Sequence, residues 1–131
     1  MSSLFCQFGY PGSPAAFEHR LSLLLSDPHV GLFVAEDAGS VVGVGMLQTL
    51  RILEGDDPMG VLLTLIVDEA AQGRGVGRTL VDALEQFARE WRCFGVVVQS
   101  GSRRIAAHAL YRKLGYEKTG ERFIKLFDAA A

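Results

Sequence analysis

The sequence has little of what exported, membrane-spanning or metal-binding proteins need. Its 131 residues include two isolated cysteines, Cys6 and Cys93, whose spacing fits neither a metal site nor a disulfide framework. The apolar stretch nearest the N-terminus, LSLLLS at 21–26, is too short to cross a bilayer, and no basic segment precedes it as in an export signal. We therefore expect a cytoplasmic protein with reduced thiols, without a bound metal and without a membrane span.

The chain also lacks an excess of basic residues. Thirteen lysines and arginines against fifteen acidic residues give a net charge of −2, which argues against a general nucleic-acid-binding protein. The charges are unevenly distributed, because residues 1–65 carry a net charge of −5 and residues 66–131 carry +3. An anionic ligand for the second half and a cationic one for the first half would fit this division, as would ordinary solvated surface charge.

The spacing of apolar residues predicts one α/β domain across residues 1–131. Segments with helical periodicity alternate with β-branched or apolar runs, and turn-forming stretches separate them. This order predicts helices packed on a mixed sheet, with no repeat and no linker. The expected elements are a helix at 13–26, a hairpin of strands at 30–36 and 41–50, a strand at 61–67 buried on both faces, a helix from 76 to about 92, a strand at 94–100, a helix at 102–114 with Ser102 as N-cap and Gly115 as C-cap, and two short terminal strands, YEKT and RFIKLF.

Residues 72–77, QGRGVG, place three glycines at alternate positions between an expected strand and an expected helix. Such a turn presents backbone N–H groups at the positive end of the helix dipole and lets the backbone approach a phosphate closely. Two known phosphate-binding patterns fit poorly. A Walker A loop would need glycine at Gln72 and lysine at Arg78, and a Rossmann loop would need glycine or alanine at Leu80.

A third pattern, Q/R-x-x-G-x-G/A, is matched at every defining position by Gln72, Gly75 and Gly77. These residues resemble the coenzyme A pyrophosphate loop of the GNAT superfamily, the acetyl-CoA-dependent N-acetyltransferases. The stretch AAHALYRKLGY at 106–116 is similar to the second signature of that family, A-x-x-x-Y-x-K-L-G-Y/F. The expected hairpin and the end of the chain are also similar to GNAT strands, so the resemblance covers nearly the whole chain.

The resemblance implies a splayed, mixed sheet flanked by helices, with acetyl-CoA as co-substrate. Amides of the glycine loop would bind the pyrophosphate, and the strand before the loop would lend main-chain groups to the pantetheine arm and to the thioester carbonyl. Arg74 and Arg78 would add positive charge there, or would be solvated charges at the helix end. The residues that the resemblance implies for cofactor binding are Leu65, Ile66, Val67, Gln72, Gly73, Arg74, Gly75, Val76, Gly77 and Arg78.

The implied reaction is direct attack of a primary amine on the acetyl thioester in a ternary complex. The amine would belong to a small molecule or to a peptide or protein, and the sequence does not identify it. By its place in the second signature, Tyr111 is the expected general acid, which would protonate the departing thiolate. We expect it on a helix face distinct from the apolar stripe that includes Ala109 and Leu110; the alternative role is a half-buried structural tyrosine.

No general base is evident. Many members of the family have a glutamate on the strand before the loop, where this chain offers only Thr64, which cannot act as a base. Acidic residues in the preceding loop could act directly, act through water or attract a cationic amine, and it is also open whether any single base exists. These residues are Glu54, Asp56 and Asp57.

The start of the chain departs from the family pattern. The segment SSLFCQFGYPGSP resembles the end of the first GNAT helix and the loop that follows, so we expect the usual first strand to be absent. An uncovered sheet edge predicts a homodimer partner, a rearranged N-terminus or reduced stability. Since a fold does not determine chemistry, a non-catalytic acyl-CoA sensor or assembly module is an alternative to the transferase.

Overall fold

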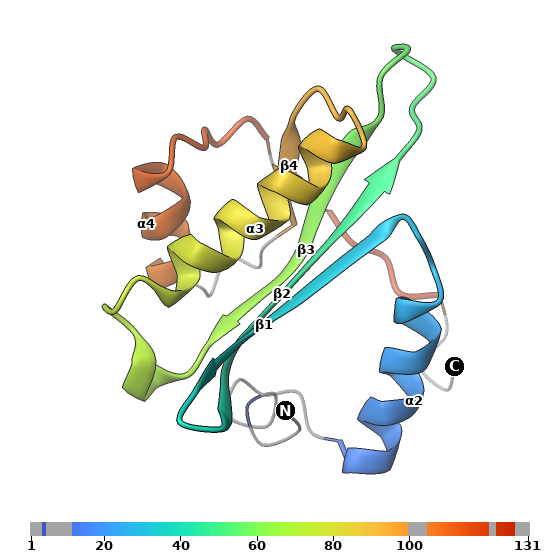
Figure 1. The fold of residues 1–131 in the computed structure, drawn as a ribbon. Helices are drawn as coiled ribbons and strands as arrows, with labels where there is room; N and C mark the ends of the chain where they lie inside the picture. Colours follow the sequence, from blue (N-terminus) through green and yellow to red (C-terminus); the bar gives the residue numbers. More distant parts are fainter. Residues whose placement is uncertain (1–3, 5–11, 100–104, 121–122, 128–131) are drawn as a thin grey trace.

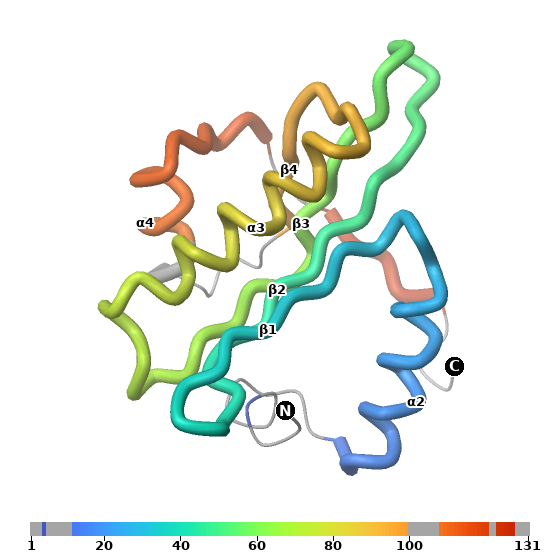
Figure 2. The backbone as a smooth tube through the Cα atoms, viewed as in Figure 1, coloured from blue at the N-terminus to red at the C-terminus, as the bar shows by residue number. Residues whose placement is uncertain are grey.

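The computed structural model describes Leu4 and residues 12–99, 105–120 and 123–127. In these residues a mixed four-stranded sheet lies between helices, as the sequence predicted (Figures 1 and 2). The strand order is β1-β2-β3-β4, with antiparallel pairing throughout except between β3 and β4, which are parallel. The elements are α2 (Pro14–Leu25), β1 (Val30–Asp37), β2 (Ser40–Leu50), β3 (Met59–Val67), the short 3-10 helix η1 (Glu69–Ala71), α3 (Val76–Glu90), β4 (Val96–Val98) and α4 (Ile105–Lys113).

The helix α2 begins where the sequence predicted it. Ser13 has an extended backbone and its Oγ accepts a hydrogen bond from the N–H of Ala16 at 3.1 Å, while Pro14 occupies the first helical position. Phe17 is the buried residue of α2 and has the Arg20 guanidinium above its ring, 5.1 Å from the ring centroid. The helix contacts β1, and it lies on the side of the sheet away from α3 (Figure 1).

The helix α3 fits closely against the sheet because three facing strand positions are glycine. A Cβ atom at any of the three would lie within 2.9 Å of an α3 side chain. The pairs are Gly31 with Phe87, Gly43 with Leu80 and Gly45 with Leu84. Glycine therefore brings the helix near enough to form one packed core, whose buried members are Leu47, Leu62, Leu65, Leu80, Val81, Leu84, Ala88 and Tyr111.

Three expectations for the strands were wrong in detail. Residues 116–120 and 123–127 form no strand, although YEKT and RFIKLF were predicted as strands, and the apolar side chains of Phe123, Ile124, Leu126 and Phe127 are at least 71% exposed. A strand requires a neighbouring edge as well as a favourable sequence, and within the described chain these segments pair with none. In addition, β4 has three residues instead of seven, and β3 is not buried throughout because Leu63 is 38% exposed.

The predicted absence of a first strand and the predicted N-cap at Ser102 both fall on residues outside the described ones. Of the first eleven residues the structure describes Leu4, which is buried against Val44 and Ile66 on the face of the sheet away from α3. Across the described helices, no segment is both long enough and apolar enough to span a membrane. The same part of the chain holds no cluster of three or more side chains suited to a metal ion.

Candidate functional site

The candidate site begins where β3 and β4 stop pairing. β4 pairs with only the first part of β3, Gly60–Leu62, and the last hydrogen bond between them runs from the N–H of Gln99 to the carbonyl of Leu62 at 2.9 Å. β3 continues for five more residues, to Val67, without β4 beside it. Among the described residues, this partial pairing agrees with the splayed sheet that the family resemblance predicted.

A β-bulge in β3 lies at the point of divergence. On the β2 side, Met46 is opposite Thr64 while the next residue, Leu47, is opposite Leu62. This pairing leaves Leu63 as an extra residue in β3. Because a bulge bends its strand and increases the local twist, it changes the course of β3 where its described pairing with β4 ends.

Past the bulge, the backbone groups of β3 alternate between the β2 side and the splayed side. The N–H of Asp68 donates to the carbonyl of Val42 at 2.8 Å, so the backbone groups of Ile66 also point toward β2. Those of Leu65 and Val67 point the other way, and the Val67 carbonyl accepts a hydrogen bond from Gln72 Nε2 at 3.2 Å. Leu65 and Val67 thus present main-chain groups to the splayed side, while Ile66 contributes a buried side chain to the core.

The loop after β3 uses its glycines in two different ways. Gly73 and Gly75 have φ angles of +83° and +82°, a left-handed conformation that favours glycine, and a Cβ at either position would meet no atom within 4 Å. Gly77 lies inside α3, where a Cβ would approach Leu110 Cδ2 to 2.8 Å. The first two glycines turn the chain, and the third allows α4 to pack closely against α3.

The first turn of α3 presents backbone donors that have no acceptor in the described structure. The first helical hydrogen bond joins the N–H of Thr79 to the carbonyl of Gly75 at 3.0 Å, and no side chain caps the helix. The N–H groups of Val76, Gly77 and Arg78 are therefore available at the positive end of a 15-residue helix, whose first turn has no acidic residue. This arrangement suits an anion such as a pyrophosphate.

The two arginines of the loop differ in their surroundings. Arg74 Nη1 lies 3.4 Å from Asp37 Oδ2 at the end of β1, and both side chains are more than 60% exposed. An ion pair this exposed contributes little to stability, so the guanidinium can turn toward a bound phosphate at small cost. Arg78 is exposed in the first turn of α3 and has no ion pair within the described residues.

Tyr111 lies in the core, so its expected place on a face apart from the apolar stripe was wrong, although Leu110 packs against the core as expected. The Tyr111 side chain is only 7% exposed and belongs to the same packed cluster as Leu65 and Val67, whereas Ala109 is exposed. The reason is that α4 leans on α3 through Leu110, which turns the neighbouring tyrosine inward and leaves the small alanine outside. The structure therefore brings Tyr111 together with the splayed half of β3.

Gly115 and Tyr116 end α4 in a Schellman motif. With Gly115 at φ +93°, its N–H donates to the carbonyl of Arg112 at 3.1 Å, and the N–H of Tyr116 donates to the carbonyl of Tyr111 at 2.9 Å. The Tyr111 and Tyr116 rings pack with centroids 5.9 Å apart. Gly115 thus acts at the C-terminal end as predicted, and it explains the K-L-G-Y part of the signature in structural terms.

Sequence reasoning missed Glu85, whose Oε2 accepts a hydrogen bond from the Tyr116 hydroxyl at 2.5 Å. Burial of Tyr116, together with this bond and the nearby carboxylate charge, raises the pKa of the phenol well above its usual range. The sequence feature that could have identified Glu85 is its place beside the apolar stripe of α3, next to Leu84 and one turn after Val81.

The acidic residues considered as a base lie far along the sheet from the glycine loop. Glu54, Asp56 and Asp57 are exposed in the connection between β2 and β3, at the opposite end of β3 from Gln72 (Figure 1). The Asp56 carbonyl accepts a hydrogen bond from Arg51 Nη1 at 3.1 Å. Thr64 lies one residue past the bulge and is partly buried. None of the three acidic residues of this connection therefore lies at the splayed half of β3.

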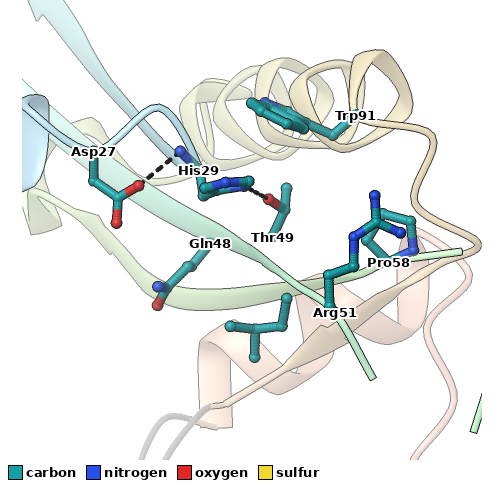
Figure 3. Close-up of a pocket in the computed structure, with 8 residues that line it drawn as sticks. Asp27, His29, Gln48, Thr49, Arg51, Pro58 and Trp91 are labelled. Carbon is teal, nitrogen blue, oxygen red and sulfur yellow. Dashed lines mark hydrogen bonds between the residues drawn. The ribbon is translucent and has the colours of Figure 1, made fainter. Parts of the chain in front are cut away.

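A recess of about 260 Å³ lies at the same far end of the sheet (Figure 3). In it the His29 and Trp91 rings pack with centroids 4.4 Å apart, and His29 Nδ1 lies 3.0 Å from Thr49 Oγ1. Asp27 accepts a hydrogen bond from the His29 N–H at 2.9 Å, and Arg51 is bound to the β2–β3 connection. The charged groups of the recess are thus engaged with the backbone, and it is separate from the glycine loop. The lining residues are Asp27, His29, Gln48, Thr49, Leu50, Arg51, Pro58 and Trp91.

Comparison with curated proteins gives relatives that are named as N-acetyltransferases. N-acetyltransferase 8 of Rattus norvegicus is 36% identical over 107 residues, which cover 78% of this chain and 46% of that protein. N-acetyltransferase 8B of Homo sapiens is 34% identical over 100 residues, which cover 72% of this chain and 42% of that protein. The chain therefore spans less than half the length of these relatives.

Solved structures share the fold. Glucosamine-6-phosphate N-acetyltransferase from Arabidopsis thaliana matches with a TM-score of 0.84 at 20% identity, covering 98% of this chain and 89% of that one. The aminoglycoside N-acetyltransferase AAC(6')-Iy, in complex with CoA, matches with a TM-score of 0.81 at 20% identity, covering 98% and 86%. Residues 1–116 match the family model described as Acetyltransferase (GNAT) family, which confirms the resemblance of the glycine loop and the tyrosine helix. The chain belongs to the GNAT family of acetyltransferases.

Proposed function

We propose that this protein is an N-acetyltransferase that transfers the acetyl group of acetyl-CoA to a primary amine by direct attack in a ternary complex. The observation that carries the proposal is the continuity of the site along the chain. The splayed half of β3, the left-handed glycine loop and the open amides of Val76–Arg78 follow one another directly. Membership in an acetyltransferase family and relatives named as N-acetyltransferases support the same reaction.

The residues of this site fit the two parts of the cofactor. Amides of the loop from Gly73 to Arg78 would hold the pyrophosphate, with Arg74 and Arg78 adding charge. The pantetheine arm would lie along β3 where β4 has left it, facing the main-chain groups of Leu65 and Val67. Bound in this way, acetyl-CoA supplies an acyl group already activated as a thioester.

Tyr111 is the candidate general acid of the transfer. The amine nitrogen would form a bond to the acetyl carbon, the carbon–sulfur bond would break, and the electron pair would leave with the sulfur. The Tyr111 hydroxyl would give its proton to that sulfur, the amine would lose a proton to solvent, and the Tyr111 phenolate would take one up from solvent. Its burial in one cluster with Leu65 and Val67 supports this role, because a buried phenol is held in place beside the strand that would carry the thioester.

Calorimetric titration with acetyl-CoA, ATP and NAD tests the site. We expect selective binding of acetyl-CoA, abolished by Gly75→Glu, since a carboxylate at the helix N-terminus would repel the pyrophosphate. Gly39→Glu is the matched control, because Gly39 also has φ +82° and open space around it. That variant carries the same backbone strain and charge outside the loop, and it should keep the affinity within about threefold. Failure of the unmodified protein to bind acetyl-CoA would contradict the proposal.

A non-catalytic acyl-CoA sensor or assembly module is the second candidate function. The observation that favours it is the placement of the acidic residues, because Glu54, Asp56 and Asp57 lie at the far end of β3 while Thr64 occupies the position expected for a base. A sensor would bind acetyl-CoA through the same loop without amine-dependent release of CoA. Turnover therefore separates the two functions, and binding alone does not.

We further propose that the acceptor is a small amine or a peptide amine, and that the protein works as a homodimer in a reducing cytoplasm. Val34 is 44% exposed on β1, the first strand of the described sheet, where a second copy would cover apolar surface. The half-buried free thiol of Cys93, whose pKa is raised by burial, suits a reducing compartment. Light scattering after size-exclusion chromatography would give the mass of the assembly, and a monomer at micromolar concentration would contradict the homodimer.

A further inference from the structure

Tyr116 connects the helix that carries the glycine loop with the helix that carries Tyr111. Its backbone N–H bonds to the carbonyl of Tyr111, its ring packs against the Tyr111 ring, and its hydroxyl bonds to Glu85 on α3. Each of the three contacts restricts a different part of the residue. Tyr116 is therefore bonded to α3 through its hydroxyl, while its backbone N–H and its ring contact Tyr111.

The hydrogen bond between Tyr116 and Glu85 is of the strong kind. The Glu85 side chain is only 24% exposed, and burying a carboxylate to this degree is costly unless a donor satisfies it. The phenol supplies that donor at 2.5 Å, the short distance typical of a hydroxyl bonded to a carboxylate. The second partner of Glu85, Arg89, lies 3.7 Å away and is 69% exposed, so it contributes much less.

Two contacts with α3, one from α4 itself and one from Tyr116 just past its end, restrain the orientation of α4. Near the start of α3, Leu110 packs against Gly77, and further along Tyr116 bonds to Glu85. Gly77 and Glu85 are eight residues apart, which is about 12 Å along a helix. Because the two contacts lie this far apart along α3, α4 cannot pivot freely about either of them. Tyr111 lies between the two attached residues, so its position relative to the glycine loop depends on both contacts.

We propose that Tyr116, through its hydrogen bond to Glu85, is a positioning residue that holds Tyr111 at the splayed half of β3. This inference rests on the proposed function, because it assigns Tyr116 a role in the same transfer. The raised pKa of Tyr116 keeps the phenol protonated well into the alkaline range, so that it remains a donor to Glu85 there as well as at neutral pH.

The test is a double-mutant cycle in kcat with Tyr116→Phe and Tyr111→Phe. The substitution Tyr116→Phe keeps the ring and removes only the hydroxyl. We expect it to lower kcat about tenfold, with KM for acetyl-CoA within twofold of the unmodified value, because the glycine loop is untouched. In the Tyr111→Phe background the same change should have no further effect on kcat, since a residue that acts only through Tyr111 has nothing left to position.

Assays would use acetyl-CoA with glucosamine 6-phosphate, neamine, lysine and a lysine-containing peptide as acceptors, well below the thermal unfolding midpoint of each variant. Arg89→Gln is the control, because it removes the other partner of Glu85 and should leave kcat unchanged. If Tyr116→Phe fails to fold, Glu85→Met removes the same bond from α3 and should give the same loss in kcat.

Two outcomes would overturn the positioning role in an active enzyme. One is an unchanged kcat in Tyr116→Phe, and the other is an equal loss of kcat with and without Tyr111, which would indicate general destabilisation. A protein that binds acetyl-CoA but transfers its acetyl group to none of the acceptors gives a different result. It would count against the proposed function itself, and the positioning role would fail with it.

Discussion

The three glycines of the loop show that one residue type can meet two physical demands within five positions. Gly73 and Gly75 adopt positive φ angles and have open space around them, so the backbone conformation requires glycine there. Gly77 has an ordinary helical backbone, and its constraint is the approach of Leu110. Gly77 therefore allows α4 to pack closely on α3, and it also belongs to the first turn of α3, which presents the open amides.

On the proposed function, Asp37 would compete with a bound phosphate for Arg74, which leads to a prediction at the residue scale. Asp37→Asn should tighten acetyl-CoA binding about threefold by calorimetry, because it frees the guanidinium at little cost to stability. Glu36→Gln is the matched control, since it removes the same charge from the neighbouring exposed residue, which has no ion pair with Arg74 among the described residues. The difference between the two variants should shrink in high salt. Equal affinities for both variants would show that the ion pair has no effect.

Local motifs could reveal only part of the site. Gln72, Gly75 and Tyr111 follow from patterns that span a few residues. Asp37 and Glu85 could not be found in this way, because their contacts with Arg74 and Tyr116 join positions 37 and 31 residues apart. Only the folded chain brings such pairs together. The inward direction of Tyr111 was missed for a related reason, since it depends on how α4 leans on α3.

At the scale of elements, the approach of α3 to the sheet depends on glycine at the facing strand positions. Gly31→Ala should lower the free energy of unfolding by about 1–3 kcal/mol, because the new Cβ would lie 2.7 Å from the Phe87 ring atoms Cγ and Cδ1, which cannot move aside as a side-chain tip can. Gly55→Ala is the control, since its Cβ would meet no atom within 4 Å. Urea unfolding measures both variants, and equal stabilities would contradict the close packing described for α3.

Elements with local signals were predicted well, and elements that need a distant partner were not. The start of α2 at the Ser13-Pro14 pair, the start of α3 at Val76 and the end of α4 at Gly115 all depend on neighbouring residues. The prediction of the terminal strands was wrong because a strand needs a neighbouring strand edge to pair with. The sequence of RFIKLF does not indicate whether such an edge is available. The length of β4 was wrong for a similar reason, since the bulge at Leu63 in β3 ends their pairing.

At the scale of the whole molecule, the sheet has two chemically different ends. The glycine loop and the open amides of α3 lie at one end, within the half of the chain that has a net charge of +3. The acidic β2–β3 connection and the recess around His29 lie at the other end (Figures 1 and 3). This division agrees with an anionic ligand for the second half of the chain, which was one of the two interpretations of the charge distribution.

The measurement that tests the central claim most directly is amine-dependent release of free CoA from acetyl-CoA, compared between the unmodified protein and Tyr111→Phe. We predict release that requires an acceptor amine, and a loss of about a hundredfold in kcat for Tyr111→Phe with acetyl-CoA affinity within twofold by calorimetry. The contradicting result is a protein that binds acetyl-CoA with the expected selectivity but releases no CoA with any amine, or whose release is unaffected by Tyr111→Phe.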